Sequence, residues 1–165
     1  MARVASLEIH KDELAFSAGH FTIFSATERE QLHGHNYNVS LCIDLTIHEN
    51  GLSFDYRHYK NKLQVLCDEI DNYFLLPANS PYLKIEDTGE YLMAEFNQKK
   101  IPFLKEDVKV LPVTNVTIEE LANWLLQNIT TNLDELNQHG IHGLTLKVFN
   151  GPGQSGGARW EKSAP

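Results

Sequence analysis

The chain has 165 residues, of which 42% are apolar and 22% are charged, a composition typical of a globular domain. A chain of this length should bury roughly 70% of the surface that its unfolded form exposes, so it needs neither a disulfide nor a metal merely to fold. Its 22 acidic residues against 14 Lys and Arg leave a formal net charge of −8, without any basic cluster. This balance argues against nucleic acids and anionic membranes as partners, and leaves small molecules and other protein subunits.

Cysteine usage and the first residues bear on the compartment. The only two cysteines, Cys42 and Cys67, show no CxxC spacing, which predicts neither a thiolate zinc site nor a secreted disulfide framework. The first twenty residues carry several charges and no long apolar run occurs, so we expect no signal peptide and no membrane span. The sequence therefore predicts a protein of the reducing cytoplasm.

Two strands are predicted in the first third of the chain. Between Leu14 and His20 every second residue is apolar until the histidine, so the even positions share one face of a strand. From His33 to Ile47 the odd positions carry two histidines, a tyrosine and then aliphatic residues, while most even positions are polar. This alternation predicts a long half-buried strand.

Two helices are predicted from a change in the apolar spacing. The first follows the Asn50-Gly51 turn and covers about Asp55–Asp71, with Asp55 as a possible cap. The second begins at Thr117, where Thr117-Ile-Glu-Glu120 has the form of a capping box, and continues to about Leu133.

The remaining elements are short. Residues 82–85 and 91–96 flank Asp87-Thr-Gly89 and predict a hairpin between the helices. A strand is predicted over Gly143–Asn150, and a short one is possible over Ala158–Glu161.

The glycine-rich segment 151–157 lacks the Lys-Ser/Thr of a phosphate-binding loop and is predicted to be a turn. Together the elements predict one α+β domain over residues 1–165, with an antiparallel sheet and two helices packed on one face.

Three of the eight histidines stand out by position. His33 and His35 are one residue apart on a predicted strand, so both imidazoles project from the same face. His20 ends the preceding strand on its apolar side, and it could reach the same point if the two strands are neighbours. Three neutral nitrogen ligands leave a fourth position open, which is the arrangement of a catalytic zinc.

Histidines also have simpler roles. A His-x-His pair on a strand is, by itself, also compatible with two polar residues near a sheet edge. The other five are expected to be surface or partly buried side chains: His10, His48, His58, His139 and His142.

Two motifs around these histidines resemble a known family. Phe16-Ser-Ala-Gly-His20 and Leu32-His-Gly-His-Asn-Tyr37 are similar to segments of the 6-pyruvoyl-tetrahydropterin synthase and 6-carboxytetrahydropterin synthase family. The resemblance extends from about residue 14 to 161. It continues through Phe54-Asp55, Ile70-Asp71, Thr117-Ile-Glu119 and Lys147-Val-Phe149.

The resemblance implies a fold, a metal and an assembly. The fold would be a T-fold, a four-stranded antiparallel sheet with two helices on one face, here with an inserted hairpin at about residues 77–112. Zn²⁺ would be held by His20, His33 and His35. Three subunits would join their sheets into a barrel, and two trimers would stack into a homohexamer with zinc sites near subunit interfaces.

The resemblance also implies a catalytic carboxylate. In most members the residue four before the first histidine of His-Gly-His is a catalytic cysteine, and here this residue is Arg29. The adjacent Glu30 resembles the subgroup in which a glutamate replaces the cysteine and 6-hydroxymethyl-7,8-dihydropterin is formed. The insertion around residues 82–96 is similar to that subgroup as well. The alternative is that Glu30 is a solvated charge in the run of residues 28–30.

Other site residues are implied with two departures from the family. The family's proton-relaying Asp-His pair aligns with catalytic candidate Asp71 and with Asn72, which has no titratable proton near neutral pH. The family glutamate that anchors the pterin aligns with Asn150, whose amide lacks the charge. The other side of the pterin would be held by Thr117, Ile118 and Glu119. Asp71 and Thr117 also have ordinary interpretations, as a helix-end charge and an N-cap.

Three functions are compatible with these residues. The first is a zinc-dependent lyase that removes or rearranges the side chain of 7,8-dihydroneopterin triphosphate or a close relative, forming a 6-hydroxymethyl-dihydropterin or a 6-pyruvoyl- or 6-carboxy-tetrahydropterin. The second is a catalytically silent homologue that binds zinc and a pterin or purine, as Asn72 and Asn150 suggest. The third is a zinc hydrolase, although nothing in the sequence specifies its substrate.

Overall fold

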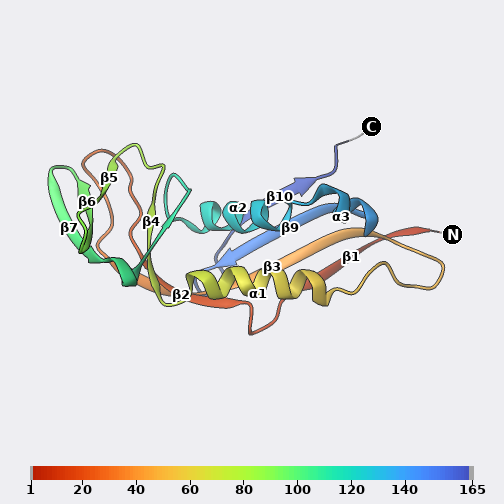
Figure 1. Ribbon diagram of the computed structural model, residues 1–165. Helices are drawn as coiled ribbons and strands as arrows, with labels where there is room; N and C mark the ends of the chain where they lie inside the picture. Colours follow the sequence, from red (N-terminus) through yellow and green to blue (C-terminus); the bar gives the residue numbers. More distant parts are fainter. Residues whose placement is uncertain (1, 164–165) are drawn as a thin grey trace.

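A curled, mixed sheet of seven strands forms the centre of the computed structural model, which describes residues 2–163 (Figure 1). The strands follow one another across the sheet in the order β10 (Ser155–Glu161), β9 (Ile141–Phe149), β3 (His33–Ile47), β2 (Ala15–His20), β4 (Tyr73–Pro77) and β8 (Val108–Leu111), and β1 (Arg3–Ile9) pairs with the second half of β3.

The α+β class is confirmed, but the predicted four-stranded antiparallel sheet is wrong in size and in strand direction. β4 lies parallel to β2, and β8 lies parallel to β4. Neither strand shows the alternation that identifies a half-buried strand. Leu75 and Leu76 are consecutive and both fully buried, and such a short apolar run has no period to detect.

The main core lies between one face of this sheet and two helices, α1 (Arg57–Ile70) and α2 (Ile118–Ile129), which run along β3 and β9 in Figure 1. The predicted inner face of β3 is confirmed, because Val39, Leu41 and Ile43 are fully buried. They stand opposite the equally buried Val148, Leu146 and Leu144 of β9. His33 and His35 share the period-two pattern of these buried residues, so both histidines project from the core side of the sheet.

The helix termini differ from the predicted ones. The N-cap of α1 is one residue later than expected: Asp55 accepts a hydrogen bond from the Arg57 N–H (3.0 Å), and the N-cap residue Tyr56 makes no side-chain cap. At α2 the Thr117 hydroxyl accepts from the Glu120 N–H (3.3 Å), but the Glu120 carboxylate accepts from Thr114 instead of closing the capping box.

The second helix does not reach Leu133, so that prediction is wrong. α2 ends at Ile129, and the Thr130 hydroxyl donates to the Leu126 carbonyl (2.9 Å). A separate helix, α3 (Leu133–Gln138), is capped by Asn132, and it leaves Leu133 exposed. The apolar spacing is compatible with one continuous helix. The chain forms two helices because the polar side chains of Thr130 and Asn132 bond to the nearby main chain.

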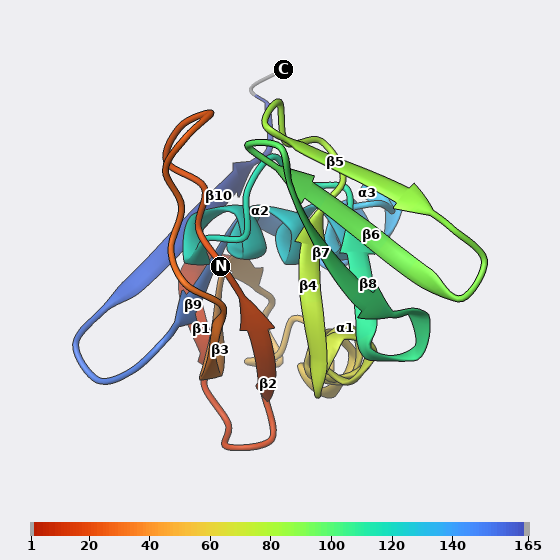
Figure 2. The same ribbon diagram turned by 90° about the vertical axis from the view of Figure 1, so that its left-hand side faces the viewer.

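A second, three-stranded sheet stands at one end of the domain, where Figure 2 shows it beside β4 and β8. It consists of β5 (Leu83–Asp87), β6 (Tyr91–Phe96) and β7 (Lys99–Leu104), followed by a 3₁₀ turn, η1 (Lys105–Asp107). The predicted hairpin is β5 and β6, whereas β7 was missed. This sheet packs on a second apolar cluster made of Phe21, Ile23, Leu76, Leu83, Ala94, Phe96 and Val108.

The end of the chain also departs from the prediction. The glycine-rich segment is a turn only up to Gln154, because β10 begins at Ser155. Within residues 2–163 no helix is both long and apolar enough to cross a bilayer.

Replacing Gly156 by alanine is expected to lower the free energy of unfolding by roughly 1–3 kcal/mol, because the new methyl group overpacks a closed contact. A Cβ at Gly156 would lie 2.6 Å from the Glu119 N and 2.7 Å from the Ile118 carbonyl carbon, both main-chain atoms. Denaturant unfolding measures the loss. The control is Gly157→Ala, whose Cβ would meet its nearest atom at 3.4 Å. Equal stability of the two variants would contradict this account of how β10 packs on α2.

Candidate functional site

Three imidazoles converge where β2 and β3 pair. His20 stands directly opposite His33, and His35 follows on the same face of β3. The ligand nitrogens of the three all lie within 4.8 Å of one another, and the Nε2 atoms of His33 and His35 are 3.0 Å apart. Tetrahedral zinc with Zn–N bonds of about 2.0–2.1 Å separates its nitrogen ligands by roughly 3.3 Å. The group is therefore close to the size that a zinc ion requires.

Hydrogen bonds orient two of the rings. The Nδ1–H of His20 donates to the Val116 carbonyl, and the Nδ1–H of His33 donates to the Gln31 carbonyl, both at 2.8 Å. A carbonyl can only accept, so the proton is on Nδ1 and the lone pair of each ring is on Nε2.

The Nε2 of His20 is buried, and within the described part of the chain it has no hydrogen-bond partner. Leaving such an atom without a partner costs free energy. A cation bound between the ligand nitrogens of the three histidines would recover that cost. The donor set thus fits a metal ion.

Burial keeps two of the histidines in the form that binds a metal. Burial lowers the pKa of His20, which is 6% exposed; its bond to Val116 opposes this, and the neighbouring His33 and His35 lower the pKa further. The pKa of His35 is also lowered, first by burial and then by His33. These two rings are therefore neutral near pH 7, as a metal ligand must be.

Glu30 lies beside this group. Its Oε2 is 3.9 Å from the Nε2 of His33 and accepts a hydrogen bond from the Thr22 N–H (2.9 Å). Partial burial raises the pKa of Glu30, but the hydrogen bonds from Thr22 and the nearby imidazoles outweigh burial, and the pKa is below its ordinary value. Glu30 is thus an ionised carboxylate held at the edge of the histidine group, able to accept a proton.

A cavity of about 190 Å³ connects these residues with the start of α2 and the end of β9. It brings together seven of the nine residues that the sequence singled out: His20, Glu30, His35, Thr117, Ile118, Glu119 and Asn150. Thr22, Tyr37 and Gln154 also line it, and sequence reasoning had given none of these a role. Burial raises the pKa of Tyr37, so that its hydroxyl stays a neutral donor.

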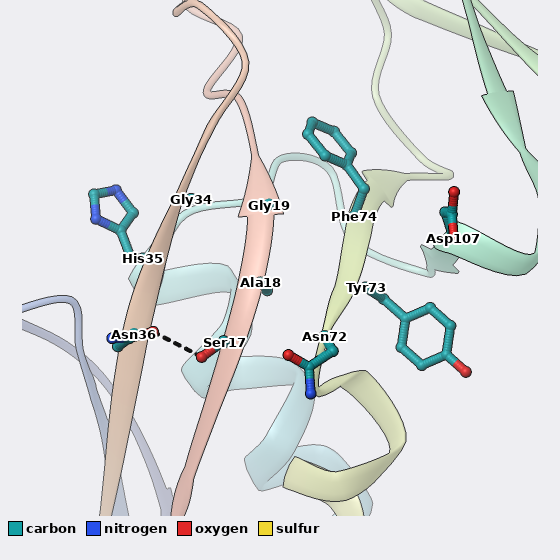
Figure 3. Close-up of a pocket in the computed structure, with 10 residues that line it drawn as sticks. All are labelled: Ser17, Ala18, Gly19, Gly34, His35, Asn36, Asn72, Tyr73, Phe74 and Asp107. Atoms are coloured by element: carbon teal, nitrogen blue, oxygen red, sulfur yellow. Dashed lines mark hydrogen bonds between the residues drawn. The ribbon is translucent and has the colours of Figure 1, made fainter.

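Asp71 lies elsewhere within the subunit. Its Oδ1 accepts from the Ser17 N–H (2.7 Å), and its Oδ2 accepts from the Asn72 amide (2.8 Å). Ser17 and Asn72 line a larger cavity of about 550 Å³, and Figure 3 shows Asn72 on one side of β2 and β3 with His35 pointing away from it. Ser17 alternates along β2 with the residues that face the histidines, so its side chain lies on the other face of the sheet, while His35 lines both cavities.

Asn115 supports the site from behind, and no pattern in the sequence indicated it. Its Oδ1 accepts from the N–H groups of Ile23 and Val116 (both 3.1 Å), and its Nδ2 donates to the Ile23 carbonyl (2.8 Å). It therefore ties the loop that carries Thr22 to the segment whose Val116 carbonyl orients His20.

Replacing Asn115 by alanine is expected to lower the free energy of unfolding by about 1–3 kcal/mol, because three buried main-chain groups lose their partner. Zinc affinity should also fall about tenfold, since His20 is no longer held in place. Denaturant unfolding and zinc titration measure the two effects. Asn128→Ala is the control, as it removes one exposed bond to the Trp124 carbonyl. An Asn115→Ala protein with unaltered zinc affinity would show that the brace does not reach His20.

Comparisons with known proteins agree with one another. The family model described as 6-pyruvoyl tetrahydropterin synthase matches residues 8–157. A protein of Methanocaldococcus jannaschii, named putative 6-carboxy-5,6,7,8-tetrahydropterin synthase, is 29% identical over 146 residues, which are 86% of each chain. The 6-carboxy-5,6,7,8-tetrahydropterin synthase of Aquifex aeolicus is 30% identical over 107 residues, 63% of this chain and 58% of that protein.

Solved structures extend the comparison. The 6-pyruvoyl tetrahydropterin synthase of Plasmodium falciparum superimposes with a TM-score of 0.91 at 26% identity, covering 96% of this chain and 99% of that one. A Plasmodium vivax 6-pyruvoyltetrahydropterin synthase, described as a catalytic-residue mutant with glutamate replaced by alanine, superimposes with a TM-score of 0.88 at 27% identity, covering 97% and 99%.

Proposed function

Because the chain belongs to the 6-pyruvoyl tetrahydropterin synthase family and shares its T-fold, we propose that it is a zinc-dependent lyase acting on 7,8-dihydroneopterin triphosphate or a close relative. It would remove or rearrange the side chain, giving a 6-hydroxymethyl-dihydropterin or a 6-pyruvoyl- or 6-carboxy-tetrahydropterin. One observation carries the proposal: the buried Nε2 of His20, which has no hydrogen-bond partner among residues 2–163, faces His33 and His35 beside the ionised Glu30.

The histidines and Glu30 would have different roles in the reaction. His20, His33 and His35 would hold the zinc, which when bound supplies a Lewis acid that makes a substrate hydroxyl or C–H group more acidic. Glu30 takes up the released proton and returns it at another atom of the substrate. Thr22 keeps the carboxylate in place through its main-chain N–H. The glutamate described as catalytic in the Plasmodium vivax relative supports a carboxylate in this role.

The far end of the cavity would hold the pterin ring. Thr117, Ile118 and Glu119 form the N-terminal turn of α2 and line the cavity together with Asn150. Asn150 keeps an acceptor oxygen but lacks the charge of a carboxylate, so we propose that it anchors the ring less tightly than a glutamate would. Asp71 keeps the catalytic role that the resemblance implies only as a prediction, because within one subunit it lies outside this cavity.

The assembly and the compartment belong to the same proposal. We expect a homohexamer, formed as a dimer of trimers, in the cytoplasm, with a small-molecule pterin as the partner. Light scattering on the eluted protein would give six times the subunit mass, whereas a monomeric mass would contradict the assembly.

A turnover assay tests the function. Purified zinc-loaded protein is incubated with 7,8-dihydroneopterin triphosphate, and the pterin products are separated and identified. Formation of a pterin with a shortened or rearranged side chain supports the proposal. Zinc and pterin binding without any product would instead establish the silent homologue, which Asn72 and Asn150 favour as the second candidate. Hydrolysis of simple esters alone would point to a zinc hydrolase.

A further inference from the structure

Arg29 lies next to Glu30 but on the opposite side of the chain. Residues 21–30 form a narrow loop between β2 and β3, closed by the bridge between Ile23 and Arg29 and by the hydrogen bond from the Glu30 N–H to the Thr22 carbonyl (2.9 Å). Neighbouring side chains of an extended segment point in opposite directions. Arg29 is therefore directed away from the histidines, towards the three-stranded sheet.

The guanidinium of Arg29 rests on two buried aromatic rings. Its Cζ is 4.9 Å from the centre of the Phe21 ring and 5.8 Å from that of Phe96. These rings are only 1% and 6% exposed, and both belong to the second apolar cluster. Because Phe21 starts the loop and Phe96 ends β6, the cation joins the loop to the three-stranded sheet.

The same guanidinium also holds the main chain of Glu30. Its Nη1 donates to the Glu30 carbonyl at 2.6 Å, while the Thr22 N–H donates to the Glu30 carboxylate at 2.9 Å. A planar guanidinium can lie on a ring with its face and donate a hydrogen bond from its edge, which the ammonium group of lysine cannot do. The residue type therefore suits both contacts at once.

We infer that Arg29 is a positioning residue for Glu30, and that the three-stranded sheet acts through Phe96 and Arg29 as the support that keeps this carboxylate aimed at the three histidines. The inference rests on the proposed function, since that function gives Glu30 its task. The position of the loop can nevertheless be measured without turnover.

Amide exchange of the zinc-loaded protein tests the position. In Arg29→Met the amide protons of Thr22 and Glu30 should exchange roughly tenfold faster, because the loop opens locally, while those of β3 and β9 keep their rates. Arg29→Lys should fall between the two proteins. The control Lys84→Met changes an exposed cation of the same small sheet and should leave every rate unaltered. Unchanged loop rates in Arg29→Met would overturn the inference, as would an equal acceleration throughout the fold.

Kinetics tests the consequence for the reaction. Arg29→Met should lower kcat by about 10–100-fold with KM within about threefold, since misplacing a reacting group by about 1 Å can cost this much. Zinc content should stay at the wild-type level. A wild-type kcat in this variant would overturn the inference. If the wild type itself has no turnover, the proposed function fails, and the exchange rates still decide the placement of Glu30.

A double-mutant cycle tests the part played by the sheet. Phe96→Leu should accelerate loop exchange, and the double variant with Arg29→Met should exchange no faster than Arg29→Met alone, because both remove one contact. Phe103→Leu is the matched control, since its ring packs against the same apolar cluster, on Phe74, but does not lie under the Arg29 guanidinium. Additive effects of the Phe96 and Arg29 substitutions would show that the sheet does not act through Arg29.

Discussion

Glu30→Gln is expected to lower kcat by about 10²–10⁴-fold while zinc content and KM stay close to those of the wild type, because a positioned general base contributes a factor of this size. The amide of glutamine keeps an oxygen that can accept the Thr22 N–H, so the loop keeps its shape and only the proton acceptor is lost. Steady-state kinetics with 7,8-dihydroneopterin triphosphate, together with metal analysis, measures both parts.

The neighbouring Glu28 supplies the control for this substitution. It belongs to the same charged run of residues 28–30 but does not line the cavity with the histidines. Glu28→Gln removes the same charge from the loop and should leave kcat unaltered. If Glu30→Gln has wild-type activity, Glu30 is not the proton acceptor, and an equal loss in both variants would indicate a general effect of loop charge.

Loss of the metal is expected to have the largest effect on the molecule as a whole. His20→Ala should weaken zinc binding by more than about 100-fold, since even residues that merely orient a ligand contribute about 10–100-fold. With zinc at about 1,000 times its Kd, bound metal adds about 4 kcal/mol of stability. Chelation of the wild type should therefore lower Tm by roughly 8–16 °C, given about 2–4 °C per kcal/mol for a chain of this size.

Two further variants distinguish the loss of a metal ligand from damage to the packing of the fold. His20 is almost fully buried, so His20→Ala also leaves a hole, whereas His35 is partly exposed and His35→Ala loses a ligand with less repacking. At the same zinc concentration both should reduce the shift in Tm caused by zinc to about a third or less of the wild-type shift. His48→Ala, which changes an exposed histidine, should keep it. A zinc-dependent shift in Tm of the full wild-type size in His35→Ala would rule out the three-histidine centre.

The central strands and the histidine group could be predicted because their pattern is local. Alternation along residues 33–47 placed His33 and His35 on the core face, and the same rule put His20 on the matching face of β2. Glu30 followed only from the family resemblance, since an acidic residue in a charged loop has no pattern of its own.

The rest depends on contacts between distant parts of the chain. Asn115 binds the main chain of Ile23, which is 92 positions away in the sequence. The parallel strands β4 and β8 are separated in the sequence by all three strands of the small sheet. Such pairings leave no period in the sequence. Leu133 is the opposite case, because here the sequence does show a period. The apolar spacing predicts a helix as far as Leu133, but the hydrogen bond of the Thr130 hydroxyl to the Leu126 carbonyl accompanies the end of α2.

The histidines sit on paired strands, whereas the acidic group sits on a loop one residue away from a cation that faces the other way. In the proposed function, the residues that would hold the metal and the residue that would move the proton are thus anchored to different parts of the fold. Because neighbouring side chains of the loop point in opposite directions, a shift of one position would direct Arg29 instead of Glu30 towards the histidines without a change in the pairing of β2 with β3. If the proposed function holds, a change of loop register alone would change the chemistry while the three histidines keep the same metal.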